Sequence, residues 1–312
     1  MPATGCELNI LLTGAAGQLG SELLPLLAAR GSVTSTDRSR PASAAGKWLE
    51  LDISNGSDLE VLLNRLQPGL IVNTAAYTAV DQAEGDVEAA FNVNAELPAR
   101  LGLWAKRNDA RLLHYSTDYI FDGKADRSYL ETDTPNPQSV YGDSKLAGER
   151  ALETAGCRYA ILRTSWVYSS HGKNFVLSML DLARRGLSLK VVDDQRGCPT
   201  WAGSLARASD AIIGAWQATE SAGQYGIFHY CDDRNMSWYE FARMIFGLAV
   251  EAELLDAVPD LTPVPSSEFP QPAARPKWSV LDTGRIASVF NIRPASFEQS
   301  LKAVIDEIKI RA

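Results

Sequence analysis

The chain has few of the residues that cross-link small proteins or bind metals. Its 312 residues include four cysteines and three histidines, with no Cys-x-x-Cys pair and no spacing typical of metal ligands. A disulfide framework and a zinc site are therefore not expected. Reduced thiols and a cytoplasmic location are predicted instead, for Cys6, Cys157, Cys198 and Cys231.

Long apolar runs and a surplus of positive charge are also missing. No stretch reaches the roughly 18 apolar residues of a membrane span, and the N-terminus carries no pattern of a secretory signal. Lys and Arg total 30 against 38 Asp and Glu, which gives a net charge of −8. This balance argues against nucleic acid or a membrane surface as partner. The length suits one large or two modest domains.

A dinucleotide-binding pattern stands at the start of the chain. The apolar run Leu8–Thr13 is followed by a glycine turn and by leucines at helical spacing from Leu23 to Leu27. Strand, glycine turn and helix in this order form the first unit of a Rossmann fold. The helix N-terminus would then present free N–H groups to a pyrophosphate. The expected cofactor residues of this turn are Gly14, Gly17, Gln18, Leu19 and Gly20.

An acid and a base follow the second predicted strand, Val33–Thr36. Asp37 lies 17 residues after Gly20, close to the spacing of a ribose-binding acid. A carboxylate there favours NADH, whereas Arg38 can pair with the 2′-phosphate of NADPH. The sequence leaves both cofactors open.

Strands and helices alternate through the first half, which predicts an α/β fold with a doubly wound parallel sheet. Further strands are expected at 48–52, 69–73, 111–116 and 158–165, and helices at 59–66, 87–107 and 140–154. A Ser57-x-x-Glu60 capping box is expected to start the first of these helices. Ligands of such sheets bind beyond the carboxyl ends of the strands. Six residues lie at or just after predicted strand ends: Gly14, Asp37, Asp52, Ala75, Thr117 and Trp166.

After about residue 170 the pattern loosens, which predicts a smaller, discontinuous substrate-binding lobe. Residues 259–276 contain six prolines and are expected to form a loop. Helices are expected at 174–185, 202–216, 237–246 and 297–310, with strands at 189–192 and 226–230. The predicted dinucleotide-binding domain is 8–170, with 205–232 returning to it, and the predicted lobe is 171–204 with 233–312.

Tyr141 and Lys145 are one helical turn apart and share a helix face. A fixed ammonium beside a phenol lowers the phenol pKa from about 10 towards neutrality, and we expect Lys145 to do this to Tyr141. Such a phenol can exchange a proton with a carbonyl or alcohol oxygen. The Ser116-Thr117 pair ends an apolar run and can supply a hydroxyl to the same oxygen.

Together these stretches resemble the extended short-chain dehydrogenase/reductases and, more closely, the dTDP-4-dehydrorhamnose reductase family. The resemblance covers roughly residues 8–310 and rests on the glycine turn and on five further segments: 73–81, 114–123, 141–149, 163–168 and 194–200. It implies hydride transfer from NADPH or NADH to carbon 4 of dTDP-4-dehydro-L-rhamnose, giving dTDP-L-rhamnose.

The resemblance also assigns roles to residues. Tyr141 would protonate the developing alkoxide, Lys145 would hold the nicotinamide ribose, and Thr117 would hydrogen-bond the reacting oxygen. Asp118 and Trp166 would touch the sugar. The cofactor would further be lined by Asp52, Ile53, Ala75, Ala76, Tyr77 and Thr78.

Two arginines and one metal site stay open at this point. Arg163 and Arg275 can each bind the diphosphate or form a surface ion pair. In family members with a metal-bridged dimer, carboxylates ligate magnesium. Glu22 matches one such position, but Gly203 falls where another acid is expected. We therefore expect no metal, and a monomer or a metal-free homodimer.

Three alternatives are weighed against the reductase. A nucleotide-sugar epimerase shares the glycine turn and the Tyr/Lys pair. A 4,6-dehydratase carries Asp-Glu after the threonine, whereas this chain has Asp118-Tyr119, which disfavours dehydration. A non-catalytic alternative is an NADP-binding regulatory subunit like that of methionine adenosyltransferase, which the intact Thr117, Tyr141 and Lys145 disfavour.

Overall fold

The computed structural model describes residues 8–42, 46–219 and 221–311. Cys6, one of the four cysteines predicted to be reduced, lies outside the described residues. Within these ranges no helix has the length and apolar character needed to span a membrane.

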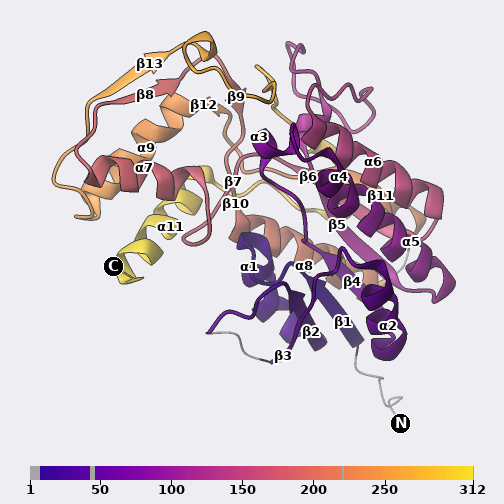
Figure 1. Ribbon diagram of the computed structural model, residues 1–312. Coiled ribbons are helices and arrows are strands. Elements are labelled where there is room, and N and C mark those ends of the chain that lie inside the picture. The colour runs from indigo at the N-terminus through magenta and orange to yellow at the C-terminus, as the bar shows by residue number, and fades with distance from the viewer. Residues whose placement is uncertain (1–7, 43–45, 220, 312) are drawn as a thin grey trace.

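A seven-stranded sheet forms the larger part of the molecule, at the right in Figure 1. Its strand order is β11-β6-β5-β4-β1-β2-β3, and all neighbours are parallel. The order reverses beside β1, so the ends of β1 and β4 mark the switch point at which such sheets bind ligands. This confirms the predicted fold class. The strands are β1 (Leu8–Thr13), β2 (Gly31–Asp37), β3 (Lys47–Glu50), β4 (Leu70–Asn73), β5 (Arg111–Thr117), β6 (Arg158–Thr164) and β11 (Gly226–His229).

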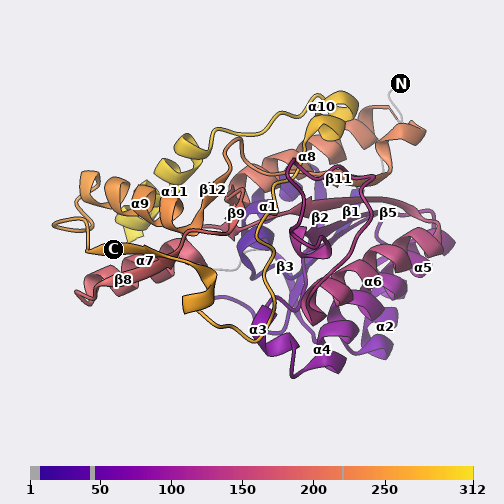
Figure 2. The ribbon, with the colours of Figure 1, turned by 90° about the horizontal axis from the view of Figure 1, so that it is seen from above.

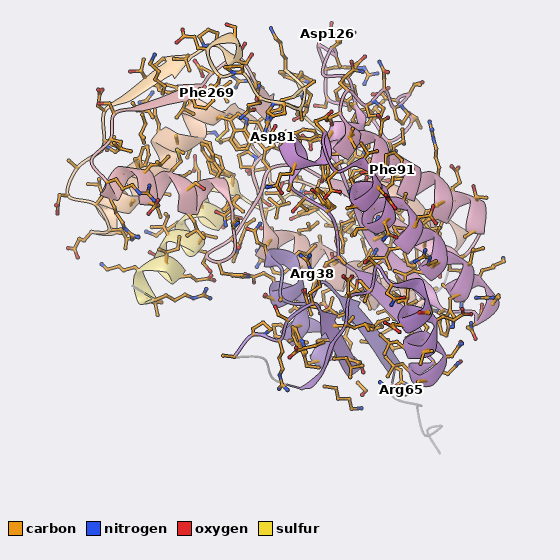
Figure 3. The ribbon with its side chains drawn as sticks, viewed as in Figure 1. Arg38, Arg65, Asp81, Phe91, Asp126 and Phe269 are labelled. Carbon is orange, nitrogen blue, oxygen red and sulfur yellow. The ribbon has the colours of Figure 1, made fainter. Side chains whose placement is uncertain are left out.

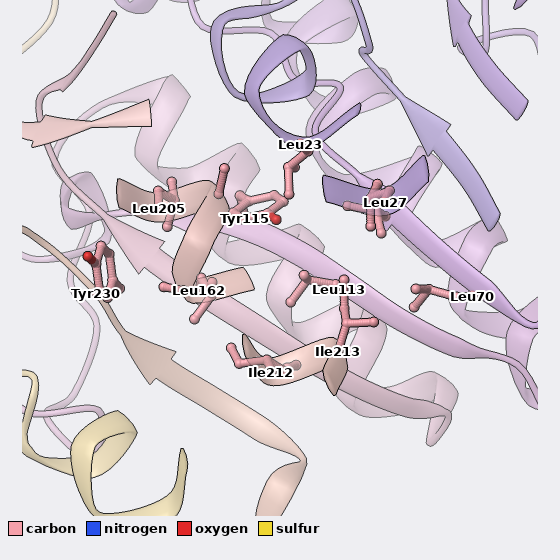
Figure 4. Close-up of a cluster of buried hydrophobic side chains, with 14 of the residues drawn as sticks. Leu23, Leu27, Leu70, Leu113, Tyr115, Leu162, Leu205, Ile212, Ile213 and Tyr230 are labelled. Carbon is pink, nitrogen blue, oxygen red and sulfur yellow. The ribbon is translucent and has the colours of Figure 1, made fainter. Parts of the chain in front are cut away.

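Alternating side chains divide the sheet into two buried faces. Ile10 and Leu12 join a cluster with α1 (Gln18–Ala28), α8 (Ala202–Ala218) and α10 (Gly284–Phe290). Figure 4 shows part of it, with Leu23 and Leu27 of α1 near the sheet residues. Leu11 points to the other face, which is covered by α2 (Gly56–Leu66), α5 (Leu97–Arg107) and α6 (Val140–Ala155). Period-two burial on both faces is what a covered parallel sheet requires.

Two helices on this second face differ in detail from the prediction. Asn55, not Ser57, is the N-cap of α2, and its side chain accepts from the Ser57 N–H. The region 87–107 is helical throughout but contains α4 (Val87–Phe91) and a π-helical turn, η1 (Asn92–Glu96), before α5. A π turn inserts a residue and often marks a functional site; here it places the buried Asn94 against α6.

A second core lies outside the main sheet, at the left in Figure 1. It is formed by α7 (Phe175–Arg184), α9 (Trp238–Glu251) and α11 (Phe297–Arg311). A parallel pair, β8 (Leu189–Val192) and β13 (Leu261–Val264), packs beside α9 (Figure 1). The expectation of a loop throughout 259–276 is therefore wrong for β13. Pro263 is tolerated because a two-stranded sheet consists of edge strands only.

Short elements connect the two parts, as Figure 2 shows from above. β7 (Val167–Tyr168) pairs in parallel with β10 (Thr200–Trp201), and β9 (Arg196–Gly197) pairs antiparallel with β12 (Met236–Ser237). The other short elements are α3 (Val80–Ala83), η2 (Asp118–Ile120), η3 (Ala222–Gln224) and η4 (Ser266–Glu268).

Candidate active site

The glycine turn brings β1, α1 and the end of β4 close together. Gly14 has φ +68°, and a Cβ there would lie 2.6 Å from the Ala75 nitrogen. A Cβ on Gly20 would lie 2.3 Å from the Gly14 carbonyl oxygen. No described side chain caps Gly17 at the start of α1, and the first turn holds no acidic residue. The positive end of this helix is therefore open to an anion, as a pyrophosphate site requires.

Gln18 links the glycine turn to the second core. Its Oε1 accepts hydrogen bonds from Asn174 Nδ2 at 2.9 Å and from Ser169 Oγ at 3.0 Å. Asn174 is also the N-cap of α7, where its Oδ1 accepts from the Leu177 N–H. Leu19, the next residue, packs partly buried against the sheet cluster. The predicted cofactor residue Gln18 is thus held from both parts of the molecule.

Asp37 sits beside the glycine turn at the end of β2. Its Oδ2 accepts from the Ala16 N–H at 3.0 Å, and its Oδ1 accepts from the Arg38 N–H at 2.7 Å. Each carboxylate oxygen has a second acceptor site, so both can still receive ribose hydroxyls. Arg38 is exposed nearby and helps lower the pKa of Asp52, for which hydrogen bonds from Ser54 are the main cause. Ile53 beside it is 7% exposed.

Asn94 fixes the segment that follows β4. Its Oδ1 accepts from the Tyr77 N–H at 2.9 Å, and its Nδ2 donates to the Tyr77 carbonyl at 3.0 Å. The same Nδ2 donates to Ser144 Oγ at 3.0 Å, and Ser144 Oγ donates to the Tyr141 carbonyl at 2.8 Å. One side chain therefore ties the predicted cofactor segment, Ala75 to Thr78, to helix α6. Sequence reasoning missed Asn94, because in the sequence it is only a polar residue within a long predicted helix, and its burial is seen only in the structure.

Tyr141 and Lys145 lie in the first two turns of α6, which Ser139 caps by accepting from the Gly142 N–H. Lys145 is 2% exposed, and its Nζ donates to the Tyr115 carbonyl of β5 at 2.6 Å. Burial lowers the Lys145 pKa to about 8, while the Glu149 carboxylate opposes this change. Tyr141 itself is partly exposed.

The expected acidification of Tyr141 by Lys145 is wrong for this structure. The pKa of Tyr141 is raised to about 12, because desolvation of the phenol and the Asp118 carboxylate raise it by more than the Thr117 hydroxyl lowers it. The ammonium is instead held by the Tyr115 carbonyl. Sequence spacing identifies neighbours on a helix face, but it does not give the desolvation that decides a pKa.

Thr117 and Asp118 form the other half of the site, at the end of β5. Thr117 Oγ1 donates to Asp118 Oδ1 at 3.0 Å and accepts from the Tyr119 N–H at 3.2 Å. Asp118 is 1% exposed, and its Oδ2 has no hydrogen-bond partner among the described residues. Burial raises the Asp118 pKa to about 6, although the Ser279 and Thr117 hydroxyls act against it. A buried acceptor without a partner is suited to a ligand hydroxyl.

Trp166 follows β6 in an unusual backbone conformation, with φ +49°. Its ring stacks on Trp238, with 3.5 Å between centroids and 7° between planes. Gly197 lies against the same ring, since a Cβ there would be 2.5 Å from Trp166 Cε2. That Cβ would also be 2.9 Å from Ser279 Oγ. Because Ser279 also acts on the Asp118 pKa, this serine connects the Asp118 side of the site to the Trp166 side.

Arg163 and Arg275, for which the sequence left diphosphate binding and a surface ion pair as alternatives, both form ion pairs. Arg163 pairs with Glu149 at 2.6 Å, and both side chains are 2% exposed, so a surface ion pair is wrong for Arg163. Arg275 donates two parallel hydrogen bonds to Asp81, at 2.9 and 2.8 Å, with side-chain exposures of 18% and 38%. Neither guanidinium is free for a diphosphate in this arrangement.

Carboxylates do not gather into a metal site within the described ranges. No group of three or more His, Cys, Asp or Glu residues there is arranged to hold a metal ion. Burial and the neighbouring Glu307 raise the pKa of Glu22, while Arg207 and Arg311 lower it. Two cations therefore accompany the two carboxylates at this position.

The residues of the glycine turn fit a dinucleotide, since the close contacts of Gly14 and Gly20 leave no space for side chains and the start of α1 is uncapped. Thr117, Asp118, Tyr141 and Lys145 converge at the adjoining end of β5. Such a set can bind a nicotinamide dinucleotide and move a proton to or from a substrate oxygen.

Proteins of known name are similar to this chain in sequence, and solved structures are similar to it in fold. The family model described as RmlD substrate binding domain matches residues 8–310. The chain is 40% identical over 296 residues to the dTDP-4-dehydrorhamnose reductase of Aggregatibacter actinomycetemcomitans, which covers 95% of this chain and 98% of that protein. It is 40% identical over 278 residues to a probable dTDP-4,6-dihydroxy-2-methyloxan-3-one 4-ketoreductase of Streptomyces antibioticus, covering 88% and 87% of the two chains.

A solved structure of dTDP-4-dehydrorhamnose reductase from Bacillus anthracis in complex with NADP superposes with a TM-score of 0.85 at 32% identity. The alignment covers 97% of this chain and 100% of that one. With the family model matching almost the whole chain, and with relatives of similar length, the chain belongs to the dTDP-4-dehydrorhamnose reductase family of extended short-chain dehydrogenase/reductases.

Proposed function

We propose that this protein reduces the 4-keto group of dTDP-4-dehydro-L-rhamnose with NADPH or NADH, giving dTDP-L-rhamnose. One observation carries the proposal: Thr117, Tyr141 and Lys145 meet at the end of β5, beside a glycine turn shaped for a dinucleotide. The relatives described above act, by their names, on dTDP-linked keto sugars. The solved relative was crystallised with NADP.

The chain's own residues supply binding and proton transfer. A nicotinamide bound at this site would supply the hydride for carbon 4 of the sugar, and Lys145 would hold its ribose. The Tyr141 hydroxyl gives its proton to the oxygen that becomes negative, and the phenolate then regains a proton from water. Thr117 donates a hydrogen bond to the same oxygen. Asp118 accepts from a sugar hydroxyl with its unpartnered Oδ2.

The high pKa of Tyr141 suits a proton donor. With a pKa of about 12, the phenol is almost fully protonated at neutral pH, which is the form a ketone reduction needs. Lys145 lies one helical turn further along α6, and the Tyr115 carbonyl accepts a hydrogen bond from its Nζ at 2.6 Å.

The cofactor is expected along the switch point of the sheet. The glycine turn with Gln18 and Leu19 would hold the pyrophosphate, and Asp37 or Arg38 the adenosine ribose or its phosphate. Asp52 and Ile53 would lie at the adenine, and Ala75 to Thr78 along the nicotinamide half. We propose that residues 8–170 and 205–232 form this dinucleotide-binding domain. The sugar nucleotide would contact Trp166 and a lobe of residues 171–204 and 233–312.

We further propose a cytoplasmic monomer or metal-free homodimer. Arg207 and Arg311 beside Glu22 and Glu307 support the absence of a bridging magnesium, since they neutralise the carboxylates in place of a cation. Sedimentation with and without EDTA tests this point, and a mass that halves on chelation would contradict it.

The reaction is tested by NADPH or NADH consumption with dTDP-4-dehydrorhamnose generated in situ. Wild type is expected to turn over and form dTDP-L-rhamnose, identified by NMR. Tyr141→Phe is expected to lose turnover while retaining NADPH affinity. Tyr159→Phe is the matched control, since Tyr159 is a partly buried tyrosine of β6 outside the site. Epimerised product without net cofactor use would favour the epimerase, and cofactor binding without any turnover would favour a regulatory subunit.

A further inference from the structure

A segment with few regular elements crosses between the two parts of the molecule. We call residues 265–282 the strap. In Figure 2 the orange chain leaves the lobe, reaches α3 and then turns back along the other part. At its start, the Ser266 N–H and hydroxyl both donate to the Asp194 carboxylate, at 2.8 and 2.9 Å. Phe269 further along is 48% exposed, whereas Ala273 is only 3% exposed.

The ion pair of Asp81 and Arg275, which we call the latch, joins the strap to α3, in the part of the molecule that contains the main sheet. The two parallel hydrogen bonds of this pair join residues 194 positions apart in the sequence. The Ala273 N–H also donates to Asp81 Oδ1, at 3.3 Å, and Arg275 Nη1 donates to the Ala273 carbonyl at 3.2 Å. Asp81 belongs to α3, directly after the predicted cofactor segment that ends at Thr78. Figure 3 places Asp81 in the middle of the molecule, between the two parts.

Beyond the latch, the strap runs along the segment that carries Thr117 and Asp118. Gly123, at φ +73°, meets the strap so closely that a Cβ would lie 2.6 Å from Pro276 Cα. The Tyr129 N–H donates to the Val280 carbonyl at 2.8 Å. The Ser279 hydroxyl lowers the pKa of the Asp118 carboxyl group. Backbone hydrogen bonds from Arg196 to Lys277 and from Ser279 to Arg196, at 2.8 and 2.9 Å, join the same stretch to the lobe.

Tyr119 connects the latch to the proton donor. Its ring packs edge-on against the ring of Tyr141, with 5.5 Å between centroids and 77° between planes. The charges of Asp118, Arg275 and Asp81 all act on the Tyr119 phenol. Tyr119 therefore contacts the Tyr141 ring and lies within electrostatic range of the latch.

From these contacts we propose that Asp81 and Arg275 are positioning residues for the proposed reduction. Their ion pair holds the strap against the segment 117–123, and so fixes Tyr119 and Asp118 beside Tyr141. The inference rests on the proposed function, because the geometry it sets is that of the keto sugar and its proton donor. Displacements of about 1 Å at a reacting centre can cost about 100-fold in rate, so a loosened strap has a measurable effect.

The first test is kinetic and uses Arg275→Met, Asp81→Asn and Arg275→Lys in the full chain. The kcat/KM for the keto sugar is expected to fall about 10- to 100-fold in the first two variants, with the NADPH dissociation constant within about twofold of wild type. Arg275→Lys should recover part of the loss, because a lysine keeps the charge but not the two parallel hydrogen bonds. Combining Arg275→Met with Asp81→Asn should add little, as expected when both members act through one contact.

Arg30→Met is the matched control. Arg30 also pairs through two hydrogen bonds with a distant aspartate, Asp210, and the exposures of 22% and 26% resemble those of the latch. That pair joins the end of α1 to α8, away from the segment 117–123. Its loss should affect stability but leave kcat/KM within about twofold. Arg275→Met and Asp81→Asn activities that match Arg30→Met would overturn the proposal.

A second test needs no substrate. Hydrogen–deuterium exchange of peptides covering 270–282 and 117–123 should be at least about tenfold faster in Arg275→Met than in wild type or Arg30→Met. Unchanged exchange would show that the pair does not hold the strap. An inactive wild type would refute the proposed function, and the exchange result would still decide the latch. An active wild type with unaffected latch variants would refute the latch alone.

Discussion

The indole rings of Trp166 and Trp238 lie almost parallel, with 3.5 Å between their centroids. Trp166 follows β6 and Trp238 begins α9, so the stack joins the main sheet to the second core. Trp166 also has a positive φ, which for a bulky residue costs on the order of 1–3 kcal/mol and persists only when its surroundings enforce it. Trp238 on one side and Gly197 on another provide that enforcement.

Trp238→Ala is therefore expected to weaken sugar-nucleotide binding without touching the cofactor. Losing an aromatic pair worth about 0.5–1.5 kcal/mol frees Trp166 to relax, so the KM for the keto sugar should rise about 2- to 10-fold. Trp238→Phe should retain most of the affinity. Far-UV circular dichroism should show an exciton couplet that disappears in either tryptophan variant. A KM for Trp238→Ala equal to that of wild type would contradict this role.

The main sheet was predictable because its strands are short apolar runs that recur between helical patterns. Ile10, Leu11 and Leu12 are all buried, on alternating faces, and a buried parallel strand has this composition whatever the details of packing. The glycine turn was predictable for a related reason. Gly14 and Gly20 occupy positions where any side chain would overlap backbone atoms.

Features that depend on tertiary contacts were not predictable in the same way. Asn55 and Ser57 are both good capping residues, and the sequence alone does not show that α2 begins at Gly56, which makes Asn55 the N-cap. The six prolines of residues 259–276 predicted a loop, but β13 forms there because it pairs with β8, which lies in a different segment of the chain. The roles of Asn94, Arg163 and Arg275 depend on partners from other segments, namely Tyr77, Glu149 and Asp81, which only the folded chain brings beside them. The pKa of Tyr141 depends mainly on desolvation, which the spacing of residues along a helix does not reveal.

Glu149→Gln should move the alkaline limit of activity to lower pH. In the proposed function Lys145 acts as an ammonium group. Burial lowers its pKa to about 8, and the Glu149 carboxylate opposes this decrease. Removing that negative charge lowers the Lys145 pKa, so kcat/KM should begin to fall at a lower pH than in wild type. Glu153→Gln is the control, since Glu153 is exposed one turn further along α6. Superimposable pH profiles for Glu149→Gln and wild type would rule out Lys145 as the group that sets this limit.

The same substitution should also destabilise the protein. It leaves Arg163 charged and without its partner in a pair whose side chains are 2% exposed. Breaking a buried pair in this way costs about 3–5 kcal/mol. Urea unfolding measures the loss, and Glu153→Gln should stay within about 0.5 kcal/mol of wild type.

Arg38→Ala should separate the two nicotinamide cofactors. If Arg38 pairs with the 2′-phosphate, its loss removes a charge-assisted contact worth about 1.5–3 kcal/mol, so the dissociation constant for NADPH should rise about 10- to 100-fold. NADH affinity should stay within about twofold of wild type. Arg65→Ala serves as the control, because Arg65 is an exposed arginine of α2; Figure 3 labels both residues. Equal weakening of both cofactors would place Arg38 elsewhere than at the phosphate.

Asp118→Asn is expected to make the protein more stable and less active. The folded-state pKa of Asp118 is about 6, above the roughly 3.9 of an unfolded chain. Between these values the folded protein keeps a proton that the unfolded chain loses, so the free energy of unfolding falls as pH rises from about 4 to about 6. Above that window the whole cost of the buried charge is present, on the order of 2–3 kcal/mol.

An asparagine does not titrate, so the stability advantage of Asp118→Asn over wild type should grow from near zero at about pH 4 to a plateau above about pH 6. Urea unfolding from pH 4 to pH 8 measures it. Asp133→Asn gives the opposite sign, because hydrogen bonds from Arg127 lower the Asp133 pKa to about 2, and that aspartate stabilises the folded state most above the unfolded pKa. A pH-independent difference between Asp118→Asn and wild type would mean that the Asp118 carboxylate is not held at a raised pKa. Turnover should fall despite the added stability, since the amide replaces one acceptor oxygen with a donor at the point where a sugar hydroxyl is expected.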